Sequence, residues 1–358
     1  MSKRDFPCHS CGANLEFTPG AQSLVCPYCG DDNAIPQSVD QVEELDFERG
    51  LAKGADMGQV EQLATRCGSC GAQVTLQDNV TADRCPFCDN PIVAQAEVTR
   101  VIQPKALLPF LVEKKVAEQA FEKWLSGLWF APSDLKRRAR AGSIDGVYIP
   151  FWTYDCATES AYSGERGEYY YVTETYTAQE NGQTVTKTRE VRRTRWYHAS
   201  GVVWVPFDDV LIVASRALPR PLFDALAPWD LQALVPYDDR YLAGFRSECY
   251  QVDLAGGFEV AKQVMDGQIR TEVRRDIGGD EQRIHALRTR HYNITFKHIL
   301  LPLWISAYRY GDKPFRFLVN ARTGEVQGER PWSWVKITFA VLAAILVITV
   351  LVLLFKDK

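Results

Sequence analysis

The chain carries the stretch Cys8-His9-Ser10-Cys11-Gly12-Ala13 near its start and repeats it as Cys67-Gly68-Ser69-Cys70-Gly71-Ala72. A second pair of cysteines follows each copy, in Cys26-Pro27-Tyr28-Cys29 and in Cys85-Pro86-Phe87-Cys88. All four cysteines of the first copy recur 59 residues later. Such a fixed displacement indicates that one small module has been duplicated.

Each copy offers four thiols as two Cys-x-x-Cys pairs with 14 residues between them. This spacing is typical of a zinc ribbon, in which two tight turns surround one tetrahedral ion. Because four thiolates fill the coordination sphere, we expect two structural Zn²⁺ ions rather than a catalytic zinc. Iron is less favoured, although a rubredoxin-like centre uses the same ligands. The predicted metal ligands are Cys8, Cys11, Cys26, Cys29, Cys67, Cys70, Cys85 and Cys88.

The remaining cysteines and the histidines form no pattern that indicates a site. Cys156 and Cys249 have no Cys-x-x-Cys partner and are expected to be ordinary half-buried thiols. His9 is expected to be an exposed turn residue. The sequence contains no P-loop, Gly-x-Gly-x-x-Gly fingerprint, His-Glu-x-x-His pair or Gly-x-Ser-x-Gly turn. It therefore predicts no catalytic residue, no enzyme activity and no small-molecule substrate.

Charge and the N-terminal residues bear on the compartment and the partner. Met1 to Pro7 contain no apolar stretch, so we expect no secretory signal and a reducing, cytoplasm-like location for the thiols. Residues 1–90 hold 6 Lys and Arg against 14 Asp and Glu, a net charge of −8, and the rest of the chain is at +4. Because this segment would repel phosphate, protein partners are favoured over nucleic acid. Basic runs at 136–140 and 187–195 leave contacts with nucleic acid or lipid open, with solvated surface as the plainer interpretation.

The predicted fold class is α+β, with two small four-cysteine zinc ribbons, a β-rich body with a long hairpin, and one C-terminal transmembrane helix. Apolar residues at helical spacing predict a helix over 112–125, and residues 253–275 are interpreted as a helix with Arg and Lys at its end. Strand patterns start at Val147 and again at Ile294. The expected segments are zinc ribbon 1 (1–35), an acidic linker with a short helix (36–63), zinc ribbon 2 (64–95), the α+β body (96–331) and the anchor (332–358).

Asn181-Gly182 predicts a tight hairpin turn in a Tyr-, Thr- and Arg-rich region. With these two residues as the loop, opposite positions pair charges and aromatic rings across the two strands. Both faces are mostly polar, so we expect the hairpin to protrude as a contact arm. The expected pairs are Glu168 with Arg195, Tyr170 with Arg193, Val172 with Val191, Glu174 with Arg189 and Tyr176 with Lys187.

The strand Leu301 to Tyr308 resembles the strand Ile149 to Tyr154, since both contain a Pro-x-Trp pattern. A second internal duplication and a chance similarity both account for this likeness.

Ile337 to Phe355 is a run of 19 residues whose only polar members are Thr338 and Thr349. As a helix it would span about 28 Å, close to the thickness of a bilayer core. Trp332 and Trp334 precede it, where interfacial aromatic residues are expected. The sequence therefore predicts a single-pass transmembrane anchor.

Basic residues indicate the orientation of this anchor, because positive flanks stay on the cytoplasmic side. We expect the N-terminus and the body to lie in the cytoplasm, at the inner membrane. The flank before the run carries Arg316, Arg322, Arg330 and Lys336, against Lys356 and Lys358 after it.

Several stretches carry a resemblance to a known family. They are the paired ribbons, Tyr148-Ile149-Pro150-Phe151-Trp152-Thr153-Tyr154-Asp155, Leu301-Pro302-Leu303-Trp304-Ile305 and Asn320-Ala321-Arg322-Thr323-Gly324-Glu325-Val326-Gln327-Gly328-Glu329-Arg330-Pro331-Trp332-Ser333-Trp334. With the final helix, they resemble a bacterial family of tail-anchored double zinc-ribbon proteins, over nearly the whole chain. Its members are often labelled primosomal protein N′ (replication factor Y) or superfamily II helicase-like, but the helicase motor motifs are absent here.

The resemblance implies neighbours of SPFH-like, TPM-domain and phage-shock-protein-A-like type, and hence a role in membrane stress or envelope maintenance. The leading hypothesis is a membrane-anchored adaptor that recruits cytoplasmic proteins to the inner membrane face. The alternative is a nucleic-acid-binding, primosome- or helicase-associated zinc protein without its own ATPase. An enzyme of unrecognised type is a third hypothesis, which rests only on the size of the body.

Overall fold

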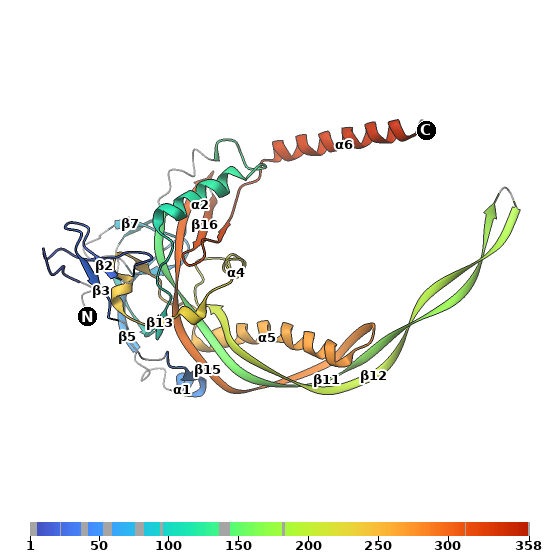
Figure 1. Ribbon diagram of the computed structural model, residues 1–358, viewed down its shortest axis with the longest axis horizontal. Helices are drawn as coiled ribbons and strands as arrows, with labels where there is room; N and C mark the ends of the chain where they lie inside the picture. Colours follow the sequence, from blue (N-terminus) through green and yellow to red (C-terminus); the bar gives the residue numbers. More distant parts are fainter. Residues whose placement is uncertain are drawn as a thin grey trace.

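The computed structural model describes residues 6–21, 23–36, 42–52, 59–75, 82–93, 96–135, 144–180, 183–311 and 313–356. Within them the fold is mixed α+β, with several sheets, two groups of four cysteines and one apolar helix at the C-terminal end. Figure 1 shows a body that includes both N-terminal modules, from which a long pair of strands and helix α6 extend. The predicted Asn181-Gly182 turn and the basic run 136–140 lie outside the described residues.

Three long strands form the centre of the body. Strand β11 (Asp145–Glu180) lies between β12 (Gln183–Val213) and β15 (Glu281–Tyr310) and is antiparallel to both. β15 begins well before Ile294, where the sequence analysis expected strands to resume. This early start gives the curved sheet a third strand along much of its length.

Shorter elements complete the body. The same sheet contains β4 (Leu45–Asp46), β10 (Ala106–Leu107), β13 (Val235–Pro236), β14 (Arg246–Ser247), β16 (Lys313–Asn320) and β17 (Val326–Gly328). The helices are α1 (Phe47–Ala52), α2 (Lys114–Ser126), α4 (Arg220–Asp224), η1 (Leu231–Ala233), η2 (Asp239–Leu242), α5 (Leu254–Ile277) and α6 (Trp334–Lys356).

Beyond Gly167, β11 and β12 continue as a two-stranded extension, called the arm here (residues 168–180 and 183–195). The pairing of β11 with β15 ends where Gly167 faces Glu281, so the described part of the arm has no third strand. Its register places Glu168 opposite Arg195, Tyr170 opposite Arg193, Val172 opposite Val191, Glu174 opposite Arg189 and Tyr176 opposite Lys187, which is the predicted pairing.

Helix α5 lies on the concave side of the curved sheet (Figure 1). Asp253 caps its start, because the carboxylate accepts a hydrogen bond from the Gly256 N–H at 2.7 Å. Gly257 brings the helix against the sheet, since a Cβ there would lie 2.3 Å from the Tyr154 hydroxyl. The helix face against the sheet is apolar and buried, and includes Phe258, Ala261, Met265, Ile269 and Val273.

Two tryptophans make matching contacts in the two halves of the body. Trp152 of β11 donates a hydrogen bond from Nε1 to the carbonyl of Val252 at 2.9 Å, directly before the N-cap residue of α5. Trp304 of β15 donates in the same way to the carbonyl of Val112 at 2.8 Å, directly before the N-cap residue of α2. Each tryptophan thus holds the start of one helix.

The alanines that follow the strand pairs β11–β12 and β15–β16 also make matching contacts. Ala214, after β12, accepts hydrogen bonds from the backbone N–H groups of the two residues before Asp253, at 2.8 and 3.0 Å. Ala321, after β16, accepts from the two residues before Glu113, at 3.0 and 2.8 Å. The strand pair β11–β12 therefore contacts the segment before α5, and the strand pair β15–β16 makes the same contacts with the segment before α2.

Between these two sets of contacts, Ile149 of β11 faces Leu301 of β15 in the antiparallel pairing. Pro150 faces Leu300 and Tyr148 faces Pro302, so the two Pro-x-Trp strands run past each other with the same offset. This is the relation that a two-fold axis between the strands would produce. It favours duplication over chance for their similarity.

The segment expected to be an acidic linker packs onto the body. β4 pairs with β15, and the Phe47 ring at the start of α1 lies 4.7 Å from the Phe258 ring. A Cβ at Gly50 would lie 2.7 Å from Phe296, so glycine allows α1 to approach the sheet. The short helix was expected, but its burial against the body was not.

Helix α6 is long and apolar enough to cross a membrane. Its stretch Trp334–Leu353 has 20 residues with a mean hydropathy of 2.7, and none of it is buried against the body. The start of the helix is attached to the body, because the Ser333 N–H donates to the Phe130 carbonyl at 2.7 Å. Lys336 Nζ donates to the Ala131 carbonyl, also at 2.7 Å.

Two of the three glycines of α5, Gly257 and Gly267, provide a test of how tightly the helix and sheet pack. We expect Gly257→Ala to destabilise the protein by about 1–3 kcal/mol, because the new methyl group would push α5 away from the sheet. Gly267→Ala meets nothing within 4 Å, and it should stabilise the helix by about 0.5–1 kcal/mol. Chemical denaturation in detergent, followed by circular dichroism, measures both. Equal effects of the two substitutions would contradict the packing described here.

Candidate metal centres

The first cysteine module forms a small sheet of β1 (Glu16–Phe17), β2 (Ser23–Val25) and β3 (Asp32–Ala34). The second contains β5 (Gln59–Arg66), β6 (Gln73–Val74), β7 (Ala82–Arg84), β8 (Pro91–Val93) and β9 (Ala96–Ile102). β5 pairs with both β6 and β9. The sheet of the second module therefore extends into the predicted linker on one side and into the predicted body on the other.

All four Cys-x-x-Cys turns share one backbone geometry. In the first turn, the Cys8 N–H donates to the Ala13 carbonyl at 2.8 Å, and the Gly12 N–H donates to the Cys8 carbonyl at 2.9 Å. The other three turns repeat both bonds at 2.8–3.0 Å. The residue after the second cysteine has a positive φ in every turn, which favours glycine. These residues are Gly12, Gly30, Gly71 and Asp89.

Asp89 is the exception to glycine at this position, with φ of 58°. Aspartate tolerates the left-handed region better than most residues. Its carboxylate is also held by Arg84, whose Nη1 lies 2.9 Å from both oxygens. The ion pair thus supports the one turn that lacks glycine.

Each module brings its four sulfur atoms to within 4.8 Å of one another. The closest sulfur pairs are 3.6 Å apart for Cys8 and Cys29 and 3.4 Å for Cys11 and Cys26. These separations exclude disulfides, whose S–S bond is about 2.05 Å. A tetrahedral ion with sulfur ligands at about 2.3 Å places its sulfurs about 3.8 Å apart. Each group of four can therefore hold one metal ion.

The second group has the same geometry, with 3.6 Å between the sulfurs of Cys67 and Cys88 and between those of Cys70 and Cys85. A hydrogen bond from Cys85 lowers the pKa of Cys70 to about 5. The same bond and burial raise the pKa of Cys85 above its ordinary value. Without a cation the sulfurs must share protons in this way, whereas a bound divalent ion lets all four ionise.

Two arginines lie beside the second group. A hollow next to it is lined by Cys70, Cys88, Arg216 and Arg316, among others. Arg316 donates from Nε to the carbonyl of Phe87, between two of the cysteines, at 2.9 Å. Four thiolates around a divalent ion carry a net charge of about −2. These guanidinium groups would offset part of it, since Arg316 also pairs with Glu329 at 3.5 Å.

The two groups differ in burial. In the first, Cys11 and Cys29 are exposed, whereas in the second only Cys70 is even partly exposed. Phe87 of the second group is completely buried against the body. Removing the second ion would therefore disturb the body core more than removing the first.

Backbone hydrogen bonds join both modules to the body. In the first, the Phe17 N–H donates to the Ala243 carbonyl at 3.0 Å, and the Gly20 N–H donates to the Phe110 carbonyl at 3.1 Å. In the second, the Thr75 N–H donates to the Ser247 carbonyl at 2.9 Å. The modules thus pack against the body as parts of one core and are not independent domains.

The structure brings the eight predicted ligands together in two groups of four. His9 is exposed, and its side chain does not belong to either group. Cys156 and Cys249 are buried rather than half-buried, because the sheet and helix that cover them could not be inferred from their sequence neighbours.

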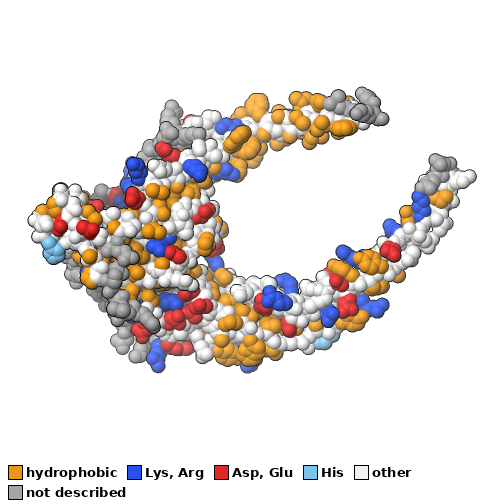
Figure 2. Space-filling view, viewed as in Figure 1, with side chains coloured by type: hydrophobic (Ala, Val, Ile, Leu, Met, Phe, Trp, Pro, Cys, Tyr) orange, Lys and Arg blue, Asp and Glu red, His pale blue; other side chains and the backbone are white. Residues whose placement is uncertain are grey.

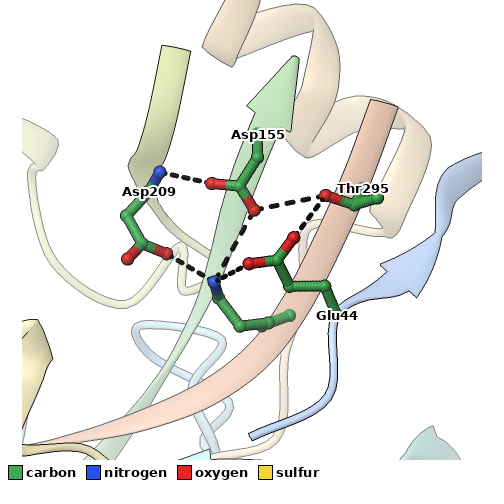
Figure 3. A network of polar contacts seen from close by, with 5 residues as sticks. Glu44, Asp155, Asp209 and Thr295 are labelled. Carbon is green, nitrogen blue, oxygen red and sulfur yellow. Dashed lines mark hydrogen bonds and ion pairs between the residues drawn. The ribbon is translucent and has the colours of Figure 1, made fainter. Parts of the chain in front are cut away.

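An acidic cluster around Lys297 was not predicted from the sequence (Figure 3). Lys297 Nζ lies 2.8 Å from Asp209 Oδ1, 3.0 Å from Glu44 Oε1 and 3.6 Å from Asp155 Oδ2. Thr295 donates to Glu44 at 2.9 Å, and the Asp209 N–H donates to Asp155. These residues come from distant parts of the chain, so no local pattern could have marked them.

The Lys297 ammonium supplies positive charge at the centre of this cluster. Burial alone would lower the pKa of Lys297, but the hydrogen bonds that it donates to Asp209 and Glu44 hold it above its ordinary value. Burial raises the pKa of Asp155. The cluster ties the segment before β4 to the centre of the sheet.

No protein-family model matches the chain, and no solved structure matches it. The chain is similar to the uncharacterized protein YdjG of Bacillus subtilis (strain 168), with 27% identity over 334 residues. These residues cover 92% of this chain and 90% of that protein. The similarity extends over nearly all of both chains but brings no activity or ligand with it.

Cysteine substitutions test the two groups. We expect the purified wild-type chain to bind one ion in each group, and Cys67→Ser to lose one of the two ions, because three thiolates hold a tetrahedral ion far more weakly. Cys249→Ser removes a buried thiol outside both groups and should keep both ions. Elemental analysis of the purified proteins measures the ratio, and Cys11→Ser serves as a second variant at the more exposed group. Unchanged metal content in both ligand variants would refute the assignment.

The Lys297 cluster leads to a pH-dependent prediction. Lys297→Met leaves the partly buried carboxylates of Asp155 and Asp209 without their cation and should destabilise the protein by about 1–3 kcal/mol near neutral pH. A carboxyl group whose pKa is raised by folding costs stability above that pKa, and the cost disappears as the pH falls. The loss should therefore shrink when unfolding is measured at mildly acidic pH.

Lys262→Met is the matched control, because Lys262 forms an exposed ion pair with Glu259 on α5. Its effect should stay below about 1 kcal/mol at either pH. A loss in Lys297→Met that does not change with pH would mean that packing, and not charge, accounts for it.

Proposed function

We propose that the chain is a membrane-anchored zinc-ribbon adaptor that recruits cytoplasmic proteins to the inner face of the membrane. In this proposal α6 crosses the bilayer once, and the N-terminus and the body stay in the cytoplasm. The uncovered apolar surface of α6 supports the first part, since exposed apolar surface of this extent in water would drive association. The basic residues before the helix support the orientation.

Both metal centres hold Zn²⁺ in this proposal. Four thiolates with tetrahedral spacing suit zinc, and they leave no position open for a substrate. The ions therefore serve to close the modules and join them to the body core. Metal analysis that finds iron in place of zinc would change the identity of the ion but not its structural role.

The observation that carries the adaptor proposal is an uncovered face of the central sheet. On the side away from α5, side chains of β11, β12 and β15 form what we call the outer face. Trp204 is 66% exposed there, beside Val202, which is 48% exposed. The members of the outer face are Ala157, Glu159, Ala161, Val202, Trp204, Pro206, Arg288, Arg290 and Tyr292.

The outer face combines apolar surface with unpaired positive charge. On the central strand Glu159 lies between two alanines, with Trp204 facing Glu159 on one side and Arg290 facing it on the other. Among the described residues, neither Arg288 nor Arg290 forms an ion pair. Such a face suits a protein segment that presents apolar side chains flanked by carboxylates, because exposed tryptophan and arginine dominate protein interfaces.

The arm supports protein binding over nucleic-acid binding. We propose that its two strands form one hairpin closed by Asn181-Gly182. Glu174 pairs with Arg193 at 2.6 Å and with Arg189 at 3.3 Å, so its single carboxylate offsets one of these two positive charges. Arg192 stacks on Tyr169, with its guanidinium 4.1 Å from the ring centre. Over residues 168–180 and 183–195 the sequence has five Lys and Arg against four Glu. This near balance offers little net charge to a phosphate backbone, which argues against the helicase-associated alternative.

The family resemblance suggests the kinds of partner. We propose that proteins of SPFH-like, TPM-domain or phage-shock-protein-A-like type are among them, in a role in membrane stress or envelope maintenance. To bind the outer face, such a partner would need an apolar surface with acidic residues around it.

A crosslinked purification from membranes tests the adaptor proposal. We compare the wild-type chain with a double variant, Trp204→Ser with Arg290→Glu, which removes the apolar anchor and reverses one charge. Losing one dominant interface contact of about 1.4 kcal/mol corresponds to about tenfold weaker binding. Specific cytoplasmic proteins should therefore be recovered at least about tenfold less with the double variant.

Tyr28→Ser is the control, because Tyr28 is 83% exposed on the first metal module, outside the outer face. It should recover the same proteins as the wild type. Recovery that is unaffected by the double variant would argue against this face as the docking site. Recovery that is abolished by nuclease would favour the nucleic-acid alternative.

A further inference from the structure

The turn after α2 exposes two large aromatic side chains that have no role in the core. Trp129 is 83% exposed and Phe130 is 40% exposed. Their neighbours do the opposite, since Ala131 is 4% exposed and Leu135 is 1% exposed. The turn is therefore held to the body by its small and aliphatic residues while its aromatic rings face outward. Tryptophan is rarely this exposed in water-soluble proteins.

This turn adjoins the beginning of the apolar helix. The Ser333 N–H donates to the Phe130 carbonyl and Lys336 Nζ donates to the Ala131 carbonyl, both at 2.7 Å. Two segments that are about two hundred residues apart in the sequence thus meet where α6 leaves the body. Figure 2 shows hydrophobic side chains along α6 and where the helix leaves the body.

The residues directly before and at the start of α6 have the same character. Trp332 is 51% exposed and Trp334 is 77% exposed. The Arg330 guanidinium lies over the Trp332 ring, 4.3 Å from its centre. Aromatic rings beside cationic groups are the composition found at the boundary between lipid tails and headgroups.

We propose that Trp129 and Phe130 form a second membrane contact, inserted into the headgroup region of the same bilayer that α6 crosses. This inference rests on the proposed function, because it requires α6 to span the membrane. The occupant of the aromatic surface is a phospholipid interface, which accepts amphipathic rings at that depth. A protein partner is disfavoured because the rings continue the surface of the anchor itself.

The second contact would fix the orientation of the body. A single helix leaves the attached body free to swing, whereas two points of contact from different parts of the fold restrict its tilt. The hydrogen bonds to Phe130 and Ala131 make this restriction rigid, since they join the two contact points directly. The outer face and the arm would then be presented to the cytoplasm at a constant angle.

Site-specific photocrosslinking to lipid tests the inference. The full-length protein, with p-benzoylphenylalanine at one position, is reconstituted into vesicles of phosphatidylcholine and phosphatidylglycerol and irradiated. The positions are 129 in the turn, 346 in α6 and 28 on the first metal module. Trp129 and Tyr28 have the same exposure of 83%, so exposure alone cannot distinguish them. Both side chains are exposed, so the replacement should not disturb folding, which metal content and circular dichroism verify.

We expect lipid adducts at 346 and at 129, each at least about tenfold above the yield at 28, because only the first two positions would lie within the bilayer. Adducts at 346 but only background at 129 would overturn the second contact and leave the anchor standing. Background at both would remove the anchor as well. A protein adduct at 129 in place of lipid would show that a protein, and not the bilayer, covers the aromatic surface.

Discussion

The antiparallel pairing of β11 with β15, centred on Ile149 and Leu301, is the interaction on which the rest of the structure depends. Both side chains are completely buried, so the strands cannot shift without exposing apolar surface from the middle of the core. From this centre Trp152 and Trp304 reach out in opposite directions, each to the start of a helix. A strand on each side of this pairing thus holds a helix of the other side through the same kind of contact.

Both metal modules bond to segments that precede the two helices. The first bonds to Phe110, shortly before α2, and also to Ala243, whereas the second bonds to Ser247, shortly before α5. The modules therefore support the segments that lead into the two helices, which Trp152 and Trp304 also hold. Ions in the two centres would stabilise the docking segments of both helices at once.

The residues that stabilise the core of this molecule differ from those that form its exposed surfaces. The cysteine groups, the Lys297 cluster and the buried face of α5 hold the core together, and most of them are covered by other residues. The outer face, the arm and α6 have the opposite property, because they expose aromatic or apolar side chains that contribute little to the core. In the proposed function these surfaces would contact the membrane and other proteins, and the core would keep them in place when they are unoccupied.

Local patterns in the sequence predicted several parts of this structure. The Cys-x-x-Cys pairs come together as expected, because the backbone of each tight turn decides where its own sulfurs lie. The register of the arm followed from Asn181-Gly182 and charge matching alone, since opposite positions in two adjacent strands are set by a single offset. The helix at 114–126 followed from apolar spacing, because its buried face repeats with the helical period, and the helix at 254–277 was expected with basic residues at its end.

Only the tertiary structure decided which distant segments meet. Lys297 with Glu44, the packing of Phe47 on α5, and the turn at Phe130 against the start of α6 join residues that no periodicity connects. The long third strand and the burial of Cys156 and Cys249 depend equally on elements elsewhere in the chain. Hydrophobic spacing predicts which face of a helix or strand is buried. The element that covers this face depends on shape and charge across the whole fold, so no local stretch of sequence determines it.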